Sequence, residues 1–328
     1  MKLSVVIPVY NGAEFIEKSY NSILNQQLTD FEIIYVDNNS KDATSKNVEV
    51  LVAKDKRVRL LHQPKQGAAP ARNMGIKAAI GDYVYVFDVD DEIYPNALNQ
   101  LISILDQYPD VEAAFGKMVK SDKGIAQTPK PTDETGEVRI EEPPFWGLNW
   151  FSNLKIVVGP PAFLYRKSVF DSIGLYNESI KNNEDTALDI KLGLTQRIAF
   201  LDTYVYLYFK HADSTIEQTK RKIPRAFMIW PRLVKEHIPF YLKHQTPKRF
   251  KSLLFSQLFQ SMGRQLVFTK GFSKRRSLKR QLCKDVEDIT IPSGIKLFLT
   301  ILVILPLEIL RKVYAYYIVP YVVKKQVN

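Results

Sequence analysis

Three carboxylates stand directly after an apolar segment: Asp88, Asp90 and Asp91 follow Tyr83–Phe87. The apolar segment consists of β-branched and aromatic residues that favour a buried strand, whereas carboxylates are rarely buried. Grouped carboxylates repel one another unless a cation or several donors share their charge. Oxygen ligands of this kind suit Mg²⁺ or Mn²⁺, and substrate phosphates usually complete the coordination. The alternative is a turn whose Asp side chains cap a helix beginning at Pro95.

Asp37 likewise follows an apolar run, Phe31–Val36. Ligands of α/β proteins bind at the carboxyl ends of the strands, where Asp37 could accept a hydrogen bond from the N–H of a nucleotide base. The alternative is that Asn39 or Ser40 caps a helix near Lys41. That explanation accounts for Ser40 but leaves Asp37 without a role.

Two further segments carry residues of the same chemistry. Arg72 lies in the small-residue segment Gly67–Gly75, where its planar guanidinium could hold phosphate or ribose oxygens, although a lone Arg is more often solvated. Glu184 and Asp185 precede the helical segment Ala187–Leu194. They could stabilise the start of that helix through its dipole, or Asp185 could act as a general base on an acceptor hydroxyl.

The elements that must position these residues alternate between strand and helix up to about residue 110. Apolar runs predict strands and helical spacing predicts helices. The strands are Leu3–Val9, Phe31–Val36, Val58–Leu61 and Tyr83–Phe87, and the helices are Glu14–Gln26, Ala68–Ile80 and Pro95–Gln107. Strands separated by helices imply right-handed crossovers and a mostly parallel sheet.

Beyond that point the pattern weakens. The polar segment Ser121–Pro144 predicts a long surface loop. Short elements are expected after it, over Ala162–Tyr165, Lys167–Ser172, Glu184–Leu194, Ile198–Leu201 and Tyr204–Phe209. From about Ile223 the chain is expected to be helical.

Five segments in a fixed order make these features specific: VVIPVYNG, EIIYVDNNSKDAT, GAAPARNMGI, GDYVYVFDVDD and NNEDTALDIKLG. In this order they resemble the family 2 glycosyltransferases over roughly residues 3–214. The resemblance implies an α/β fold of the GT-A type. It also implies transfer of a sugar from a nucleotide diphosphate donor, with inversion of the anomeric centre and uridine diphosphate as the default nucleotide.

The resemblance also implies roles for individual residues. Asp185 is the expected base, with Glu184 beside it. Pro8, Val9 and Asp37 are expected to line the pocket of the nucleotide base. Arg72 and Asp88 are expected to contact the ribose or the diphosphate. The expected ligands of Mn²⁺ or Mg²⁺ are Asp88, Asp90 and His211. Asp91 is left open between a structural role and one that faces the acceptor.

One departure concerns Asp37-Asn38-Asn39-Ser40, where many relatives carry Asp-Asp or Asp-Asp-Gly-Ser. Asn38 keeps a hydrogen-bonding side chain without the charge, which leaves the choice of nucleotide base open. The chemistry expected is a one-step in-line displacement, with the metal neutralising the departing diphosphate. No Ser/His/Asp or Cys/His constellation suggests a covalent intermediate.

Composition divides the chain into a domain of residues 1–219 and a basic region of residues 220–328. The first part carries 23 Lys/Arg and 30 Asp/Glu, a net charge of −7. The second part carries 23 Lys/Arg and 5 Asp/Glu, a net charge of +18, and the two sum to +11. Cys283 is the only cysteine, so no internal disulfide forms and a reducing compartment is expected. Met1–Ile7 lacks the features of a secretory signal, and we expect a cytoplasmic protein.

The basic region predicts amphipathic helices. Apolar residues recur at helical spacing along Phe250–Leu266 with Lys and Arg between them, and Leu297–Leu307 and Val313–Val323 are two further apolar runs. Neither run reaches the ~20 residues of a spanning helix. Basic helices with aromatic anchors favour a membrane interface, so an anionic membrane on the cytoplasmic side is the expected partner. The alternative is an ordinary helical bundle or an oligomer interface.

The sequence therefore predicts a metal-dependent, membrane-associated, inverting glycosyltransferase with a GT-A domain and a helical C-terminal extension. Its acceptor would be a glycan or a lipid-linked saccharide in polysaccharide biosynthesis. Nucleic acid is not expected as a partner, because no recognisable binding fold accompanies the charge. The rival functions are a nucleotidyltransferase, which would carry a Gly-rich basic loop after its first strand, and a membrane-binding scaffold with a degenerate transferase domain.

Overall fold

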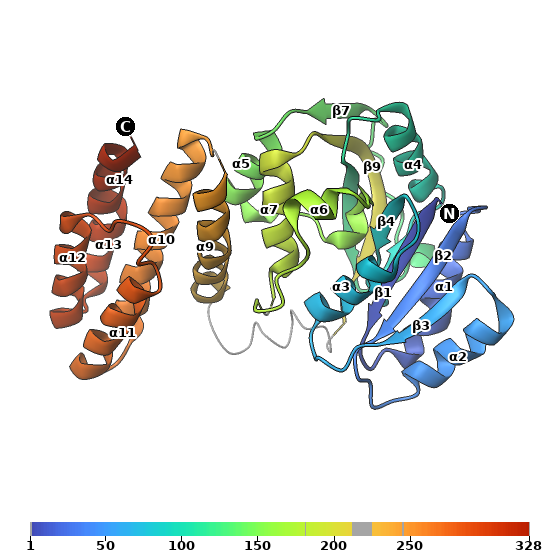
Figure 1. Cartoon of the computed structure of the whole chain (residues 1–328), viewed down its shortest axis with the longest axis horizontal. Coiled ribbons are helices and arrows are strands. Elements are labelled where there is room, and N and C mark those ends of the chain that lie inside the picture. Colours follow the sequence, from blue (N-terminus) through green and yellow to red (C-terminus); the bar gives the residue numbers. More distant parts are fainter. Residues whose placement is uncertain (1, 181, 212–224, 245, 328) are drawn as a thin grey trace. The chain divides into compact units, whose positions relative to one another are not determined.

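The computed structural model describes residues 2–180, 182–211, 225–244 and 246–327, and it divides into two compact units, Met1–Glu217 and Gln218–Asn328 (Figure 1). Each unit buries apolar side chains of its own, such as Val6 in the first and Leu254 in the second. The predicted domain boundary, between residues 219 and 220, lies outside the described residues and stays a prediction.

Four strands near the N-terminus form the parallel part of the sheet, side by side in the order β3-β2-β1-β4 (Figure 1). They are β1 (Leu3–Val9), β2 (Phe31–Asp37), β3 (Val58–His62) and β4 (Tyr83–Val86), and they are linked by α1 (Ile16–Leu24), α2 (Thr44–Lys54) and α3 (Ala68–Ala78). Nearly all residues of β1, β2 and β4 are buried, as expected for strands covered on both faces. These strands, and the helices expected near α1 and α3, confirm the predicted α/β pattern.

The rest of the nine-stranded sheet is mixed. Beyond β4, strand β8 (Phe163–Arg166) runs antiparallel to both β4 and β6 (Ala113–Ser121), and β6 pairs in parallel with β9 (Ile198–Phe209). The short strands β5 (Glu92–Ile93) and β7 (Val138–Glu141) both pair antiparallel with β9. Helix α4 (Ala97–Gln107) connects β5 to β6.

Several elements differ from the prediction, among them β5 and β6, for which no strand was predicted. The segments 198–201 and 204–209 form the single strand β9, because Asp202 pairs with Lys117 of the neighbouring β6 at 2.7 Å and does not end the strand. The predicted loop 121–144 contains β7, whose mixed polar sequence resembles a loop until an edge of the sheet pairs with it. Helix α5 (Phe145–Ser152) had no prediction; its Trp150 is buried against Phe115 and Phe163.

Helices α6 (Val169–Ile173) and α7 (Glu184–Thr195) complete the first unit. Helix α7 carries apolar residues on most of its surface and is almost wholly buried from Thr186 to Leu194. It packs beside α5, so the aromatic residues of α5 fix the position of α7. The contacts of α5 lie near Gly193 and Leu194, at the end of α7, whereas the start of α7 is held by the hydrogen bond from Arg72 to Glu184.

The second unit is a helical bundle. Its helices are α9 (Arg225–Lys243), α10 (Lys248–Phe268), α11 (Phe272–Lys284), α12 (Ser293–Ile304), α13 (Glu308–Val313) and α14 (Val319–Val327), with a π turn at Tyr314–Ile318 joining the last two. The apolar stripe of α10 is buried in the bundle, which corrects its interpretation as a membrane-binding stripe. Among the helices that the structure describes, none combines the length and apolar composition needed to span a bilayer.

Candidate active site

The predicted polar residues of the first unit gather at the carboxyl ends of β1, β2 and β4. The parallel register places Val9 opposite Asp37, and Val6 of β1 opposite Val86, two residues before Asp88. Carboxyl ends of adjacent parallel strands meet at one edge of a sheet, which is where α/β proteins bind ligands. The topology therefore brings two of the predicted motifs together without any contact between their side chains.

Asp37 is buried at the end of β2, and neighbouring hydroxyl groups hold its carboxylate. Its Oδ1 accepts a hydrogen bond from the Ser40 backbone N–H at 3.1 Å, and its Oδ2 accepts one from Ser45 Oγ at 2.7 Å. Burial opposes ionisation, but the hydrogen bonds outweigh it and lower the pKa of Asp37 below its ordinary value. Asp37 is therefore a preformed anionic acceptor at the strand end.

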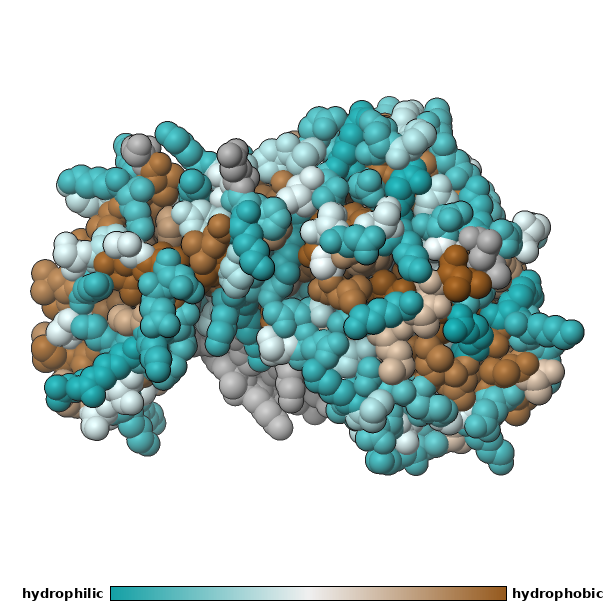
Figure 2. All heavy atoms as spheres, viewed as in Figure 1, coloured by the Kyte–Doolittle hydropathy of each residue, from teal (hydrophilic) through white to brown (hydrophobic). Residues whose placement is uncertain are grey.

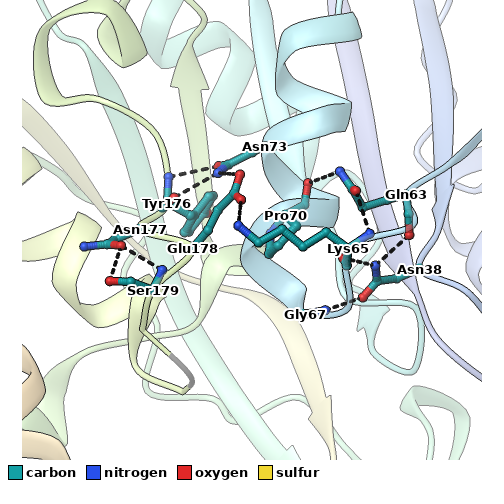
Figure 3. Close-up of polar contacts among 10 residues, drawn as sticks. All are labelled: Asn38, Gln63, Lys65, Gly67, Pro70, Asn73, Tyr176, Asn177, Glu178 and Ser179. Carbon is teal, nitrogen blue, oxygen red and sulfur yellow. Dashed lines mark hydrogen bonds and ion pairs between the residues drawn. The ribbon is translucent and has the colours of Figure 1, made fainter.

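Asn38 ties the end of β2 to the loop that leads into α3 (Figure 3). Its Nδ2 donates to the carbonyl oxygens of Gln63 at 3.0 Å and Lys65 at 2.7 Å, and its Oδ1 accepts from the Gly67 N–H at 2.6 Å. Two of these partners are acceptors, so the position requires a donor that an ionised Asp lacks. This geometry favours the Asn38 amide over a carboxylate at this position.

Arg72 bridges two carboxylates from distant segments. Its Nη2 donates to Asp88 Oδ1 and its Nη1 donates to Glu184 Oε1, each at 2.9 Å. Burial alone would lower the pKa of Arg72, but Asp88 and Glu184 outweigh it and raise that pKa well above its ordinary value. Helix α3 reaches this position because Gly75 lies against β1, where an added Cβ would meet Val6 Cγ1 at 2.2 Å.

Asn73 holds the segment before α7 against α3 (Figure 3). Its Oδ1 accepts from the Tyr176 backbone N–H at 3.0 Å, and its Nδ2 donates to the Tyr176 carbonyl at 2.8 Å and to Glu178 Oε1 at 3.1 Å. This places the Tyr176 ring 5.4 Å from the Arg72 guanidinium, within the range of a cation–π contact. Asn73 and Tyr176 were not predicted, although the position of Asn73 next to Arg72 was the available signal.

Asp90 and His211 form a second contact at the edge of the sheet. Asp90 Oδ2 lies 2.9 Å from His211 Nε2, and the two side chains are 24% and 22% exposed. The His211 ring also packs on Phe15 and Phe209. Burial and then the charge of Asp88 raise the pKa of Asp90, and the contact with His211 offsets only part of that rise. Additional positive charge beside Asp90 would therefore be stabilising.

Asp91 is turned into the protein. Its Oδ1 accepts from the Phe209 backbone N–H at 2.9 Å, and its Oδ2 makes no hydrogen bond with the residues that the structure describes. Burial, followed by the charges of Asp90 and Asp88, raises the pKa of Asp91 well above its ordinary value. Of the two roles left open for Asp91, the structure favours the structural one, a link between this turn and the end of β9.

The start of α7 supplies three acidic groups. Glu184 is buried and paired with Arg72, and burial raises its pKa while Arg72 offsets part of the rise. Asp185 is partly exposed, so its carboxylate is accessible to solvent. Its Oδ1 accepts a hydrogen bond from the Thr186 N–H at 2.7 Å. Asp189 lies one turn further along and is buried; its Oδ1 lies 3.4 Å from the Tyr165 hydroxyl, and its Oδ2 has no hydrogen-bond partner within the described part of the chain. Asp189 was not predicted as a residue of the site, because its position in the sequence is that of an ordinary residue in the α7 helix.

The remaining predicted site residues line the end of β1. Pro8 is partly exposed, whereas the Val9 side chain is buried and its carbonyl accepts from the Asn38 N–H at 2.8 Å. The structure thus joins Arg72, Asp88 and Glu184 in one cluster and Asp90 with His211 in another. Asp37, Pro8 and Val9 stand at neighbouring strand ends. Within the described ranges, no group of three or more His, Cys, Asp or Glu side chains is arranged to hold a metal ion.

Comparison with known proteins agrees with this geometry. The profile of the family described as glycosyl transferase family 2 matches residues 4–174. The glycosyltransferase GlyG of Streptococcus pneumoniae is 30% identical over 220 residues, which span 65% of this chain and 72% of GlyG. The uncharacterized glycosyltransferase EpsJ of Bacillus subtilis is 29% identical over 217 residues, 66% of this chain and 63% of EpsJ, which is less than two thirds of that protein.

Solved structures share the fold. TarS of S. aureus in complex with UDP-GlcNAc superposes with a TM-score of 0.64 at 19% identity, covering 99% of this chain and 92% of TarS 1-349. The mannosyltransferase PcManGT of Pyrobaculum calidifontis, in complex with GDP-Man and Mn²⁺, gives a TM-score of 0.53 at 13% identity, covering 99% of this chain and 86% of PcManGT. These likenesses confirm the predicted GT-A fold.

Proposed function

The chain belongs to glycosyl transferase family 2, and on that premise we propose that it transfers a sugar from a nucleotide diphosphate donor to an acceptor hydroxyl with inversion at the anomeric carbon. The observation that carries this proposal is the convergence of Arg72, Asp88 and the start of α7. An anion-binding guanidinium, a strand-end carboxylate and a partly exposed candidate base come from three distant segments.

The donor would bind along the ends of β1 and β2. Asp37 would accept a hydrogen bond from the nucleotide base, beside Pro8 and Val9, because its carboxylate is already held ionised by Ser40 and Ser45. Arg72 would bind the diphosphate oxygens in exchange for part of its present pairing with Asp88. The UDP-GlcNAc found in TarS supports a uridine nucleotide as the first donor to test.

Asp185 would act as the general base. It would take the proton of the acceptor hydroxyl while that oxygen attacks the anomeric carbon from the face opposite the leaving diphosphate, which inverts the centre in a single step. Glu184 would not reach the acceptor, since its carboxylate is buried against Arg72. Its role would be to hold Arg72 in place beside the leaving group.

The carboxylate and imidazole groups of the site are suitable ligands for a divalent cation such as Mn²⁺ or Mg²⁺. Asp88, Asp90 and His211 would hold it. A cation there would offset the burial and the charge of Asp88, which together raise the pKa of Asp90. When bound, the cation would supply Lewis-acid stabilisation of the charge that develops on the diphosphate. The Mn²⁺ in the complex of PcManGT supports this choice of ion.

The acceptor class that we propose is a glycan or a lipid-linked saccharide in polysaccharide assembly. Family membership and the position of Asp185 support this part of the proposal. The partly exposed Asp185 lies at a helix start, where a sugar hydroxyl can approach its carboxylate.

The test is a panel of UDP- and GDP-sugars incubated with the full-length protein and Mn²⁺, with and without chelator, scoring release of the nucleoside diphosphate. We expect turnover of at least one donor, loss of activity with chelator, and a fall of about 10²–10⁴-fold in Asp185→Asn. Asp171→Asn, at an exposed position of α6, is the matched control and should retain activity. Turnover of Asp185→Asn equal to that of the wild type would contradict the assignment of the base.

A further inference from the structure

The last helices of the second unit leave apolar side chains uncovered, and we propose that this surface binds an anionic lipid bilayer. The surface, called here the tail face, consists of Leu305, Leu307, Ile309, Tyr316, Tyr317 and Tyr321. This inference does not depend on the proposed glycosyl transfer. It concerns a different unit of the chain and a different ligand.

The direction of the tail face follows from the packing of the helical stretch 308–327. Tyr314 is fully buried, and its hydroxyl donates to the Phe259 carbonyl of α10 at 3.0 Å. Gly263 of α10 makes room for this ring, since an added Cβ would lie 2.5 Å from Tyr314 Cε1. Val319 and Val323 continue the same buried stripe. The residues on the opposite side of the helix are therefore directed away from the bundle.

The exposed stripe is apolar and unusually aromatic. Ile309 is 69% exposed, and Tyr316 and Tyr317 are 69% and 73% exposed. The two tyrosines lie in the π turn at Tyr314–Ile318, two and three residues after the buried Tyr314. Figure 2 shows hydrophobic side chains gathered on the surface of the bundle over α12 and α13. The bundle therefore buries the stripe of α10 but leaves this second one open.

The charge around the tail face favours an anionic partner. Residues 220–328 carry a net charge of +18. Lys312, Lys324 and Lys325 are exposed on the same helical stretch, whose only acidic residue, Glu308, is paired with Arg311. A second copy of this unit would bring the same positive charge against it, which opposes self-association through this face.

Helix α11 extends the positive surface beside α12. Arg275 Nε donates to the Val303 carbonyl at 2.8 Å and Lys279 Nζ donates to Thr300 Oγ1, so α11 is fastened along α12. Helix α11 has no buried residue, and Lys274, Arg276 and Arg280 are exposed on it. Tyrosines together with Lys and Arg are the residues that anchor protein in the headgroup layer of a bilayer. An anionic lipid surface matches both the apolar and the basic part of this region.

The mode of binding follows from the lengths of these helices. No described helix is suited to span a bilayer, and the stretch 308–327 already buries one side against α10. The tail face would therefore lie in the plane of the interface, with its tyrosine rings at headgroup depth and the lysines near lipid phosphates.

The experiment is cosedimentation of the full-length protein with vesicles of phosphatidylcholine containing phosphatidylglycerol, against vesicles of phosphatidylcholine alone. We expect binding to the anionic vesicles that weakens as salt is raised. Tyr316→Ser/Tyr317→Ser should weaken the binding about tenfold or more, because two exposed rings lose their apolar contact. Lys312→Gln/Lys324→Gln/Lys325→Gln should weaken it about fivefold for each lysine removed.

Ile80→Ser is the matched control, since Ile80 is 63% exposed on the first unit and should leave vesicle binding unchanged. All variants alter exposed side chains, and thermal unfolding checks that each one folds. Absence of vesicle binding by the wild type would overturn the proposal, as would equal binding to phosphatidylcholine alone. A dimer that the tyrosine substitutions dissociate, with no vesicle binding, would overturn it in favour of self-association.

Discussion

Asp90 Oδ2 lies 2.9 Å from His211 Nε2, although the two residues are 121 positions apart in the chain. Asp90 belongs to the turn after β4, and His211 follows β9, which approaches that turn through its pairing with β5. The buried Asp91 reinforces this junction by accepting from the Phe209 backbone N–H. The end of β9 is thus held against the acidic turn at two successive residues of that turn.

Removal of either Asp90 or His211 should weaken the binding of the divalent cation. We expect Asp90→Asn and His211→Ala each to raise the Mn²⁺ concentration needed for half-maximal donor turnover by about tenfold or more. The measurement is a Mn²⁺ titration after chelation, with the rise in melting temperature on adding Mn²⁺ as a second readout. His244→Ala, in the second unit, is the control. Unchanged Mn²⁺ titrations in both site variants would remove Asp90 and His211 from the metal site.

Arg72 should contribute to stability as well as to donor binding. Arg72→Ala leaves two carboxylates, Asp88 and the buried Glu184, without their shared cation, so we expect a loss of about 3 kcal/mol or more in the free energy of unfolding. Arg72→Ala/Glu184→Gln removes one of the stranded charges and should recover part of that loss. Urea unfolding of the two variants measures the difference. A loss in the double variant that equals or exceeds the loss in Arg72→Ala would show that the pair is not coupled.

The position of Asn38 should not tolerate a carboxylate. Asn38→Asp replaces a double donor by an acceptor facing the carbonyl oxygens of Gln63 and Lys65, so the free energy of unfolding should fall by about 1–3 kcal/mol. Asn39→Asp is the matched control, because Asn39 is exposed and its left-handed backbone (φ 66°) also tolerates Asp. Guanidinium unfolding compares them. A neutral effect of Asn38→Asp would indicate that the loop before α3 rearranges freely.

Asp189 should make stability depend on pH. Burial, and then the charge of Asp185, raises the pKa of Asp189 well above its ordinary value, so the native state keeps a proton that the unfolded chain releases from about pH 4. Stability should therefore decline as pH rises above that value and level off above the folded pKa. Relative to Asp189→Asn, the wild type should lose about 1.4 kcal/mol per pH unit in this window.

The measurement is urea unfolding of the wild type and Asp189→Asn between pH 4 and 7. The exposed Asp171→Asn serves as the control and should follow the pH profile of the wild type. Parallel pH profiles for the wild type and Asp189→Asn would mean that Asp189 is ionised in the native protein. The prediction concerns a difference between variants, so the titration of carboxyl groups that do not interact with Asp189 cancels.

The sequence was sufficient where local pattern dictates structure. The runs of β-branched residues before Val9, Asp37 and Asp88 predicted the parallel strands, because such residues favour a buried pleated surface. The alternation with helices then placed Asp37 and Asp88 at one edge of the sheet, since consecutive parallel strands share their direction. Residue types and order were also enough to predict Arg72 and the start of α7 as parts of the same site.

Elements defined by their partners were not predictable in this way. Strand β7 is polar and becomes a strand only by pairing with β9. Asp202 could interrupt an apolar pattern in the sequence without interrupting β9, because Lys117 of β6 neutralises it. Asn73 and Tyr176 contact each other across 103 positions; the position of Asn73 next to Arg72 draws attention to Asn73, but nothing local identifies Tyr176 as its partner.

By itself, therefore, the sequence determined the four parallel strands β1 to β4, the order of the motifs and the edge of the sheet where the acidic groups end. Only the tertiary structure decided which groups meet: Arg72 with Asp88 and Glu184, and Asp90 with His211. It also decided that the bundle buries the stripe of α10 and leaves Tyr316 and Tyr317 exposed. The physical reason is the same in both cases. Propensity belongs to a segment, whereas burial and pairing depend on what packs against that segment.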